Sequence, residues 1–305
     1  MRGPLALLST DKDFISPWIG NPTANRLGLH VGRIVLADAM DRVRWALHAP
    51  LAEDREWIAE LRRDGVVAIP NFLEPAAFAA LRAEVIGTIR DSLNHFPARD
   101  NDRPGFNAKE PFGDGLGFDR FDGGTLNRFI HLTPEITPRT VAAVRSERFR
   151  RLYKAAQGRD FPLSAVSLYY TRHGSEDVHD IQKDFHRDTF HFTIKLWYFV
   201  ADVTPENGPF IYVRGSNHSS KERLNWEYRR SLEASGPGGD KGGSFRITED
   251  ELRDLGYPEP TVFTVPANTL IVGDTHGFHR RGDAVPGTER FAVYGGMRRS
   301  PFIPL

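Results

Sequence analysis

The chain has 305 residues, and its 40 Lys and Arg residues balance 40 Asp and Glu residues, so the formal net charge is zero. A balanced charge without a run of basic residues argues against a nucleic-acid partner. The chain has no Cys, which excludes disulfides, thiolate metal sites and Cys nucleophiles, and which fits a reducing compartment. Any metal site must therefore use His and carboxylate ligands.

Apolar runs are short throughout the sequence. None approaches the roughly 18 to 20 apolar residues of a membrane-spanning helix, and the run near the N-terminus is too short for a secretory signal. We therefore expect a cytoplasmic protein without a membrane partner. The length exceeds that of an average domain, but a large β-barrel with appended helices can absorb it. We predict one domain over residues 1–305.

The first half of the chain is predicted to be helices and loops. Residues 1–53 lack a clear pattern and contain Pro and Gly near residues 17–22, which indicates a loop-rich leader. A helix is expected from residue 54 to Gly65, followed by a strand at 66–69 and a second helix beginning near Pro75. Residues 97–128 are rich in Gly, Asp, Asn and Pro and predict a flexible loop beside the site. We expect this helical flank with its loops to span residues 54–160.

The second half is rich in β-forming residues. Short strands are predicted at residues 163–171, 193–203, 209–213, 261–265, 268–272 and 290–297. Residues 219–257 form an insertion with a helix at 221–232 and a capping box from Thr248 to Glu251, and we expect it to act as a lid. Such strands after a helical start favour a mostly β fold with flanking helices, a double-stranded β-helix or jelly-roll barrel, with its core at 161–300.

The residues that carry chemistry are concentrated in Phe185-His186-Arg187-Asp188. On a strand, residues two apart share a face, so His186 and Asp188 can reach one ion together. Two His and one carboxylate on one side of a metal form the facial triad of non-haem Fe(II) oxygenases. Near pH 7 the imidazoles are neutral and the carboxylate is ionised, as such a metal requires.

The third ligand is expected about ninety residues later, where two histidines compete. His276 lies three residues before His279, so on a straight strand they face opposite sides and only one can point at the metal. His191 also follows the motif, but it breaks the two-residue parity with Asp188. A role for His191 in the pocket or behind the ligands is therefore the better prediction.

The segment after the H-x-D motif resembles a known family. Residues 196–210 include Pro205-Glu206-Asn207-Gly208 and continue into Arg214-Gly215-Ser216-Asn217-His218. This order resembles the phytanoyl-CoA dioxygenase family of Fe(II)/2-oxoglutarate oxygenases, in which a strand, such a turn, another strand and a Pro-Gly-Ser-His element follow the H-x-D. Residues 63–73 are similar to the helix-strand element that opens the family. The resemblance covers about residues 55 to 300.

The resemblance implies a non-haem Fe(II)/2-oxoglutarate-dependent dioxygenase that uses Fe(II), 2-oxoglutarate and O2. It implies that His186, Asp188 and His279 are the catalytic iron ligands and that Arg290 binds the distal carboxylate of 2-oxoglutarate. The planar guanidinium suits this role because it meets a carboxylate with two hydrogen bonds and stays charged when partly buried. The eleven-residue step from His279 to Arg290 suits the family better than the fourteen residues from His276.

Other cosubstrate contacts are less specific. Trp197 takes the place of an aromatic residue that the family sets beside the cosubstrate, although a core Trp on an apolar strand is an equal alternative. The family often has a small hydroxyl residue two positions after the distal His, where this chain has Arg281. The second contact to 2-oxoglutarate is thus unassigned, with Thr193 and Tyr169 as candidates. In place of the family's Pro-Gly-Ser-His, this chain has Arg214-Gly215-Ser216-Asn217-His218. The turn is still expected there, but its details are left open.

The implied function is hydroxylation or another oxidation of a small-molecule substrate, with release of succinate and CO2. Asp188 favours hydroxylation, because the halogenases of this class have a small residue at that position. Two alternatives stay open, a zinc hydrolase on the same triad and a jelly-roll metal- or small-molecule-binding protein without oxygenase activity. Cationic residues beside the motifs either attract an anionic substrate or are exposed strand-end charges; they are Lys183, Arg187, Arg280, Arg281, Arg298 and Arg299.

Overall fold

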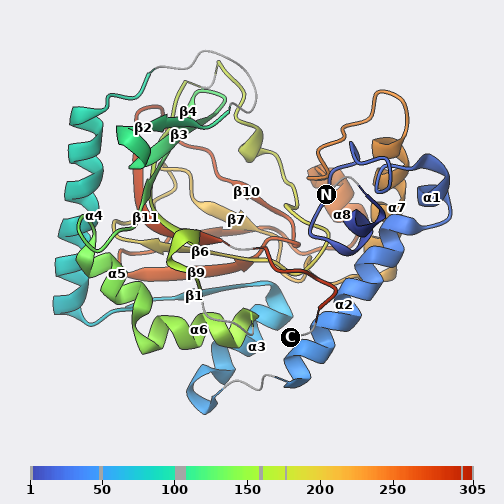
Figure 1. Ribbon diagram of the computed structural model, residues 1–305, viewed down its shortest axis with the longest axis horizontal. Coiled ribbons are helices and arrows are strands. Elements are labelled where there is room, and N and C mark those ends of the chain that lie inside the picture. Colours follow the sequence, from blue (N-terminus) through green and yellow to red (C-terminus); the bar gives the residue numbers. More distant parts are fainter. Residues whose placement is uncertain are drawn as a thin grey trace.

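The computed structural model describes residues 3–47, 51–99, 108–157, 161–175, 177–296 and 298–303. β-Sheets occupy the centre of the molecule, α3 to α6 pack on one side of them, and α1, α2, α7 and α8 gather at the opposite end (Figure 1). The α-helices are α1 (Pro22–Arg26), α2 (Leu29–Leu47), α3 (Arg55–Asp64), α4 (Pro75–His95), α5 (Pro138–Arg145), α6 (Glu147–Gln157), α7 (Lys221–Ser235) and α8 (Glu249–Asp254). Short 3-10 helices lie at η1 (Pro4–Leu8), η2 (Ala52–Asp54), η3 (Gly113–Gly115), η4 (Leu163–Ala165) and η5 (Ile181–Lys183).

In the described part of the chain the strands form two antiparallel sheets. The strands are β1 (Val66–Ile69), β2 (Glu110–Phe112), β3 (Gly117–Asp122), β4 (Thr125–His131), β5 (Val166–Arg172), β6 (Ile194–Phe199), β7 (Phe210–Tyr212), β8 (Thr261–Phe263), β9 (Thr269–Asp274), β10 (His279–Arg281) and β11 (Glu289–Gly296). The eight-stranded sheet has the order β1-β9-β6-β11-β5-β4-β3-β2, and the three-stranded sheet has the order β10-β7-β8.

The prediction of a mostly β, jelly-roll fold with flanking helices is confirmed. The two sheets face each other across an aromatic cluster that includes Phe199 from β6, Phe210 from β7 and Phe263 from β8. Their strands do not join into one continuous ladder among the described residues, so the sheets face each other without closing into a barrel.

The two-residue alternation of β6 determines what each face of the large sheet meets. Ile194, Leu196 and Tyr198 belong to the apolar core that packs against α3 to α6. Lys195 and Trp197 point the other way, toward the smaller sheet, where they line a cavity. Burial of the first face holds the strand in register, and that register decides which side chains reach the cavity.

Two predictions about the first half of the chain were wrong. Residues 29–47 form the 19-residue helix α2, where a loop-rich leader was expected. Residues 97–128 were predicted as a flexible loop; of these, 100–107 lie outside the described residues, but β2, β3 and most of β4 belong to the large sheet. Gly and Asp there mark the tight turns between strands, including Gly113, Asp114, Gly115 and Gly123 with positive φ.

The insertion at 219–257 packs as part of the body of the protein. α7 contacts α1 and α2, and Phe245 and Trp226 share an apolar cluster with Phe14 of the N-terminal segment. The predicted capping box is present, because Thr248 and Glu251 exchange hydrogen bonds at the start of α8. A lid function for this insertion stays a prediction.

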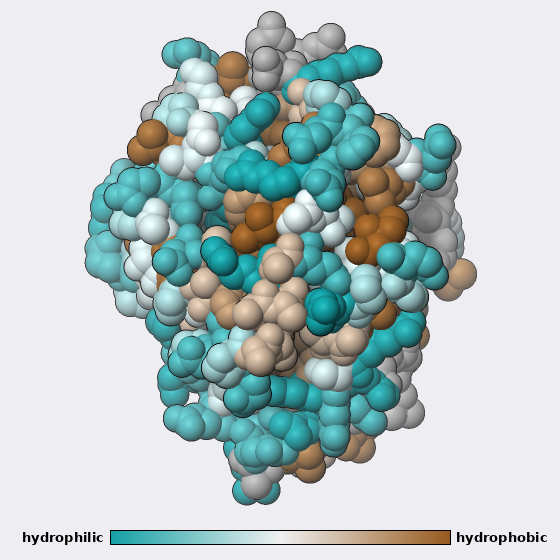
Figure 2. Space-filling view, turned by 90° about the vertical axis from the view of Figure 1, so that its left-hand side faces the viewer, coloured by the Kyte–Doolittle hydropathy of each residue, from teal (hydrophilic) through white to brown (hydrophobic). Residues whose placement is uncertain are grey.

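The outer surface beside α4 is mostly hydrophilic, with small apolar patches between hydrophilic side chains (Figure 2). Among the described residues, no helix is both long enough and apolar enough to cross a bilayer.

Candidate active site

His186, Asp188 and His279 converge on one point between the sheets. Their potential ligand atoms all lie within 4.8 Å of one another, and no other such group of three exists among the described residues. The Nε2 atom of His186 is 3.9 Å from Oδ1 of Asp188, and Nε2 of His279 is 3.5 Å from Oδ2 of the same carboxylate. The structure thus brings these three side chains together, while their binding of a metal stays a prediction.

Backbone pairing places the two histidines opposite each other. The amides of His186 and His279 each donate to the carbonyl of the other residue at 3.0 Å, which makes an antiparallel bridge between the H-x-D segment and β10. His186 is bridged on its other side to Arg246 of the insertion. The H-x-D segment is therefore fixed between two neighbouring segments.

The ring orientation of both histidines is fixed as well. Nδ1 of His186 donates to the Asp184 carbonyl at 2.8 Å, and Nδ1 of His279 donates to the Gly277 carbonyl at 2.9 Å. A carbonyl only accepts hydrogen bonds, so the proton of each neutral ring is on Nδ1 and the lone pair is on Nε2. Both lone pairs are consequently available on the side where Asp188 lies.

Charge states in the site suit a cation. Burial, together with the nearby His279 ring, lowers the pKa of His186 to about 3, so the imidazole is neutral at pH 7. Burial by itself would raise the pKa of Asp188, but the charge of Lys195 and the contact with His279 hold it well below its usual range. A neutral His186 imidazole and an ionised Asp188 carboxylate thus face the His279 ring.

These residues fit a divalent iron. Metal bonds of about 2.0–2.2 Å allow two ligands of one ion to be at most about 4.4 Å apart, and both distances to Asp188 are shorter than that. Two imidazoles and one carboxylate are also the donor set of the facial triad. Each imidazole is held from behind by a backbone carbonyl, as metal-bound histidines usually are.

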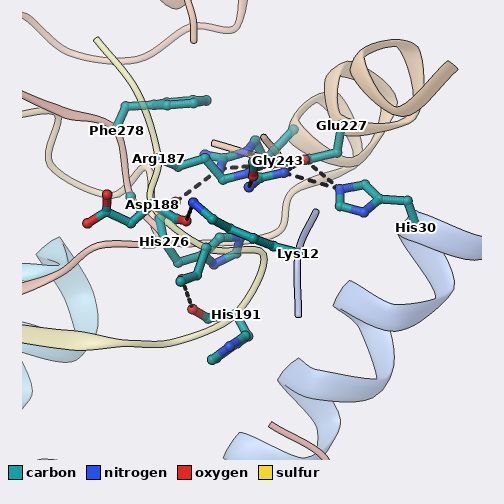
Figure 3. A network of polar contacts seen from close by, with 12 residues as sticks. Lys12, His30, Arg187, Asp188, His191, Glu227, Gly243, His276 and Phe278 are labelled. Carbon is teal, nitrogen blue, oxygen red and sulfur yellow. Dashed lines mark hydrogen bonds and ion pairs between the residues drawn. The ribbon is translucent and has the colours of Figure 1, made fainter. Parts of the chain in front are cut away.

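Two lysines that the sequence analysis did not identify contact Asp188. Lys195 of β6 forms an ion pair with Oδ2 at 2.5 Å, and the carboxylate raises the pKa of this ammonium although burial opposes it. Lys12 of the N-terminal segment donates to the Asp188 carbonyl at 2.6 Å and to the Ser244 hydroxyl (Figure 3). Burial lowers the pKa of Lys12 to about 8.

A cavity of about 580 Å³ opens between the sheets beside the triad. The large sheet contributes side chains from the inward face of β3, β4, β5, β6 and β11, and the smaller sheet contributes Phe210 and β10. The insertion closes one side with Ser244 and Arg246. The cavity therefore combines an aromatic wall with several cationic groups.

Arg290 lies on β11 and lines this cavity. It is only 7% exposed, and its Nη1 donates to the carbonyl of Gly208 in the Pro-Glu-Asn-Gly turn. Burial lowers the pKa of Arg290 to about 10, and no carboxylate of the described residues lies within 4.0 Å of it. A buried guanidinium without a protein counter-charge is suited to bind the carboxylate of a ligand.

The other predicted cosubstrate contacts differ in position. Trp197 lines the cavity, with its ring 4.7 Å from that of Phe210. Tyr169 also lines it and donates its hydroxyl proton to Asn127 at 2.6 Å. Thr193 does not line it, because its hydroxyl lies between Thr189 and His191. Of the two candidates for the second contact, only Tyr169 is therefore at the cavity.

Arg281 replaces the small hydroxyl residue of the family and is neutralised by the protein. It is 8% exposed and pairs with Asp180 at 2.5 Å, and it donates to Asn127 at 2.8 Å. A second carboxylate, that of Asp122, is 3.4 Å away. Arg281 is thus held in the wall of the cavity, close to Tyr169.

His276 and His191 lie outside the triad. His276 is 1% exposed in the turn between β9 and β10, and it borders a separate hollow together with Asp38 and Asp274. His191 is buried against Phe192 and Thr193. The structure therefore brings His279, and neither of these histidines, to His186 and Asp188.

Behind the H-x-D segment lies a network of buried charges (Figure 3). Arg187, between the two triad residues, forms hydrogen bonds of 2.6 and 2.7 Å to Glu227 of α7 and donates to the Gly243 carbonyl. Glu227 also accepts from Arg223 at 3.1 Å and from His30 of α2 at 2.9 Å. The network joins α2, α7 of the insertion and the H-x-D segment.

Three cavity residues were missed by the sequence analysis, and they differ in whether the sequence carries a signal that could have identified them. Lys195 interrupts an apolar strand with the same parity as Trp197, so alternation could have revealed it. Lys12 carries no such signal, because its position depends on packing of the N-terminal segment 176 residues away from Asp188. Arg120 was hidden in the region expected to be a loop.

Comparison with protein families gives one match. The family described as phytanoyl-CoA dioxygenase matches residues 61–242. This range includes His186 and Asp188 and ends before His279 and Arg290. No curated protein matches the chain.

Similar solved structures are distant. The epimerase SnoN in complex with Fe3+, alpha ketoglutarate and nogalamycin RO is 18% identical, with 83% of this chain and 88% of that chain covered and a TM-score of 0.46. HygX from Streptomyces hygroscopicus with nickel and 2-oxoglutarate is 15% identical, with 81% and 86% covered and a TM-score of 0.43. EctD from S. alaskensis with bound Fe is 17% identical, with 81% and 77% covered and a TM-score of 0.44. With TM-scores below 0.5, none of these likenesses bears on the chemistry of this chain.

Proposed function

This chain belongs to the phytanoyl-CoA dioxygenase family and is a non-haem Fe(II)/2-oxoglutarate-dependent oxygenase, and we propose that it hydroxylates a small organic molecule with release of succinate and CO2. The observation that carries this proposal is the convergence of two imidazoles and one carboxylate beside a cavity that also contains Arg290, whose guanidinium has no carboxylate partner among the described residues.

His186, Asp188 and His279 would hold the iron on one side. With 2-oxoglutarate and O2, such a centre supplies the oxidising power that no protein side chain has. The role of the chain is to present two Nε2 lone pairs and one carboxylate. Nδ1 anchoring by backbone carbonyls fixes the rings, and Lys195 limits the rotation of the carboxylate through its ion pair with Oδ2.

Arg290 would bind the distal carboxylate of 2-oxoglutarate. The carbonyl of Gly208 holds one nitrogen of its guanidinium, and Nε has no hydrogen-bond partner among the described residues. Tyr169 would provide the second contact, because its hydroxyl is at the cavity beside Arg281 and Arg290. Trp197 would pack beside the cosubstrate on the same face of the sheet.

The rest of the cavity would hold the substrate. The volume of the whole cavity, about 580 Å³, is in the range of small-molecule sites. Its aromatic wall, including Phe129, Phe199 and Tyr294, offers an apolar surface beside the triad. The asymmetry between a wall of rings and a set of cations gives the substrate a preferred orientation.

Oxygen-dependent formation of succinate tests the proposal. The purified protein, loaded with Fe(II) under argon and mixed with 2-oxoglutarate, is expected to release succinate when air is admitted, faster when a suitable substrate is present. The same protein loaded with Zn(II) is the control and should release none. Hydrolysis of a test ester by the Zn(II) form, without succinate from the Fe(II) form, would favour a zinc hydrolase instead.

A further inference from the structure

The cavity beside the triad has a large excess of positive charge. Among the described residues, eight Lys and Arg side chains line it, against the carboxylates of only Asp188 and Asp240. Asp188 belongs to the triad, and the Asp240 side chain is 73% exposed. An iron site needs negative ligands, so this surplus must serve another purpose.

Most of these cations are neutralised by the protein. Five of the eight have a carboxylate within 4.0 Å; the pairs are Lys195–Asp188, Arg281–Asp180, Arg120–Asp122, Arg246–Asp184 and Arg280–Asp283. In the described part of the chain, Arg290, Lys12 and Arg298 have no such partner. Arg290 is assigned to 2-oxoglutarate by the proposed function, which leaves Lys12 and Arg298.

Lys12 is held at the triad by neutral atoms. Its ammonium donates to the Asp188 carbonyl at 2.6 Å and to the Ser244 hydroxyl, which leaves one of its three protons without an acceptor among the described residues. Burial lowers the pKa of this ammonium and the Asp188 carboxylate raises it, but that carboxylate is already paired with Lys195, so a half-buried ammonium among other cations is unfavourable in the free protein. An anion that binds in the cavity would remove this cost.

The charges do not balance when iron and cosubstrate are counted. Fe(II) and the two carboxylates of 2-oxoglutarate cancel, and so do Asp188 and Lys195. The positive charges of Arg290, Lys12 and Arg298 then remain, of which Arg298 is exposed to solvent. A neutral substrate would leave these charges in place, and a cationic substrate would be repelled by them.

Both unpaired cations lie outside residues 61–242, the range shared with the family. Lys12 precedes α1, and Arg298 follows β11. Phe14 anchors the segment that carries Lys12, because its ring packs against Phe245 and its amide donates to the Lys241 carbonyl at 2.8 Å. The position of Lys12 is thus a built feature of this chain.

We propose that the substrate carries a carboxylate or phosphate group and that Lys12 and Arg298 bind this group at the end of the cavity beside Asp188. This proposal rests on the proposed function in one respect, namely that 2-oxoglutarate binds to Arg290 and leaves Lys12 and Arg298 for the substrate. Lys12 and Arg298 determine specificity and do not take part in the oxidation itself.

Sulfate, a divalent oxyanion that does not precipitate Fe(II), tests the anion site. The protein is loaded anaerobically with Fe(II) and saturating 2-oxoglutarate and titrated with sulfate in a calorimeter at constant ionic strength. Lys12→Met and Arg298→Met are each expected to weaken sulfate binding at least about tenfold, because each removes one charge-assisted contact. Lys12→Arg keeps the charge and should retain most of the binding.

Lys221→Met is the matched control, since Lys221 is exposed on α7 and does not line the cavity. It removes the same charge and should leave sulfate binding within about twofold of the original protein. Equal sulfate binding by the original protein and Lys12→Met, with circular dichroism showing both folded, would overturn the proposal. Equal weakening by Lys221→Met would also overturn it, because the effect would then be one of net charge.

Substrate-stimulated turnover separates the two sources of the anionic group. Short carboxylic acids, phosphate monoesters and the amides of the same acids are compared for stimulation of succinate formation. We expect stimulation by acids or by phosphate monoesters, and none by the amides. Stimulation by the amides alone would contradict the anion site and support the oxygenase. In the sulfate experiment, absence of a 2-oxoglutarate complex would contradict the oxygenase. Sulfate binding can still be measured in that case, so the two failures are distinguishable.

Discussion

Buried arginines on the two sides of the H-x-D segment differ in whether a carboxylate of the protein pairs with them. His186 and Asp188 face the cavity, whereas Arg187 between them points into the network behind it. In the network, Glu227 pairs with Arg187, and the remaining donors of the network arginines reach backbone carbonyls. In the cavity, Arg290 has no carboxylate partner among the described residues.

This difference separates structural charges from functional ones. A buried arginine that the protein neutralises holds segments together, and here it joins α2, α7 and the ligand segment. A buried arginine that the protein leaves unpaired is costly to the free protein and is retained where a ligand supplies the opposite charge. Substitution of Arg290 or of a triad residue should therefore impair ligand binding with little effect on folding, and substitutions in the network should do the reverse.

The largest effect is expected on the cavity side. His279→Ala removes a metal ligand, and succinate formation should fall at least about a thousandfold, with loss of bound iron measured by metal analysis after gel filtration. His276→Ala is the matched control, three residues earlier and equally buried, and it should keep its iron. Loss of iron from His276→Ala but not from His279→Ala would reverse the assignment.

On the network side, Glu227→Ala should impair folding. It leaves Arg187 and Arg223 buried without a carboxylate, and the free energy of unfolding should fall by about 3–5 kcal/mol in urea denaturation. Glu233→Ala on the same helix removes a surface partner of Arg230 and should cost at most about 1 kcal/mol. Similar losses for both variants would show that the network does not stabilise the fold as argued.

Arg290→Met sharpens the comparison between an unpaired and a paired arginine. The affinity for 2-oxoglutarate should fall about 10- to 100-fold because one charge-assisted contact is lost, while iron still binds. Arg128→Met removes a buried arginine that does not line the cavity and that pairs with Asp119 at a distance of 2.7 Å. It should lower stability and leave the 2-oxoglutarate affinity unchanged, as measured by anaerobic absorbance titration.

The smallest effect is expected at the turn that holds Arg290. Gly208 has φ of +70°, and a Cβ there would be 2.4 Å from Cε1 of His173. Gly208→Ala should displace the carbonyl that accepts from Arg290 and lower 2-oxoglutarate affinity about three- to tenfold, at a cost of about 1 kcal/mol. Gly238→Ala has a similar φ of +73° but open space around it, and it should leave the affinity unchanged.

Most helices and strands whose residues show a clear local pattern were predicted correctly from the sequence. The predicted strands after residue 160 and α3, α4 and α7 follow from alternation, helical periodicity and capping, and the structure places each within a few residues of its predicted range, whereas β10 was not predicted. The region at 97–128 was misjudged because Gly and Asp suggested a loop, while the pairing of β3 with β4 and β5 decides its structure.

Within the site, the residues tied to a motif were easier to find than those tied to packing. The two-residue spacing of His186 and Asp188 follows from strand geometry, and His279 was implied by the family resemblance. The structure brings the three residues together. Thr193 was a candidate by strand position alone, and its hydroxyl is turned to Thr189. Lys12 could not be found, since nothing local links residue 12 to a triad formed by residues 186–279.

Anaerobic titration of the purified protein with Fe(II) and 2-oxoglutarate tests the central claim most directly. Binding of 2-oxoglutarate to iron held by His186, Asp188 and His279 should produce a weak visible charge-transfer band that saturates at one equivalent of each. The band should be absent in His279→Ala and should need more 2-oxoglutarate in Arg290→Met. A folded protein that binds neither ligand, or a band that persists in His279→Ala, would contradict the account.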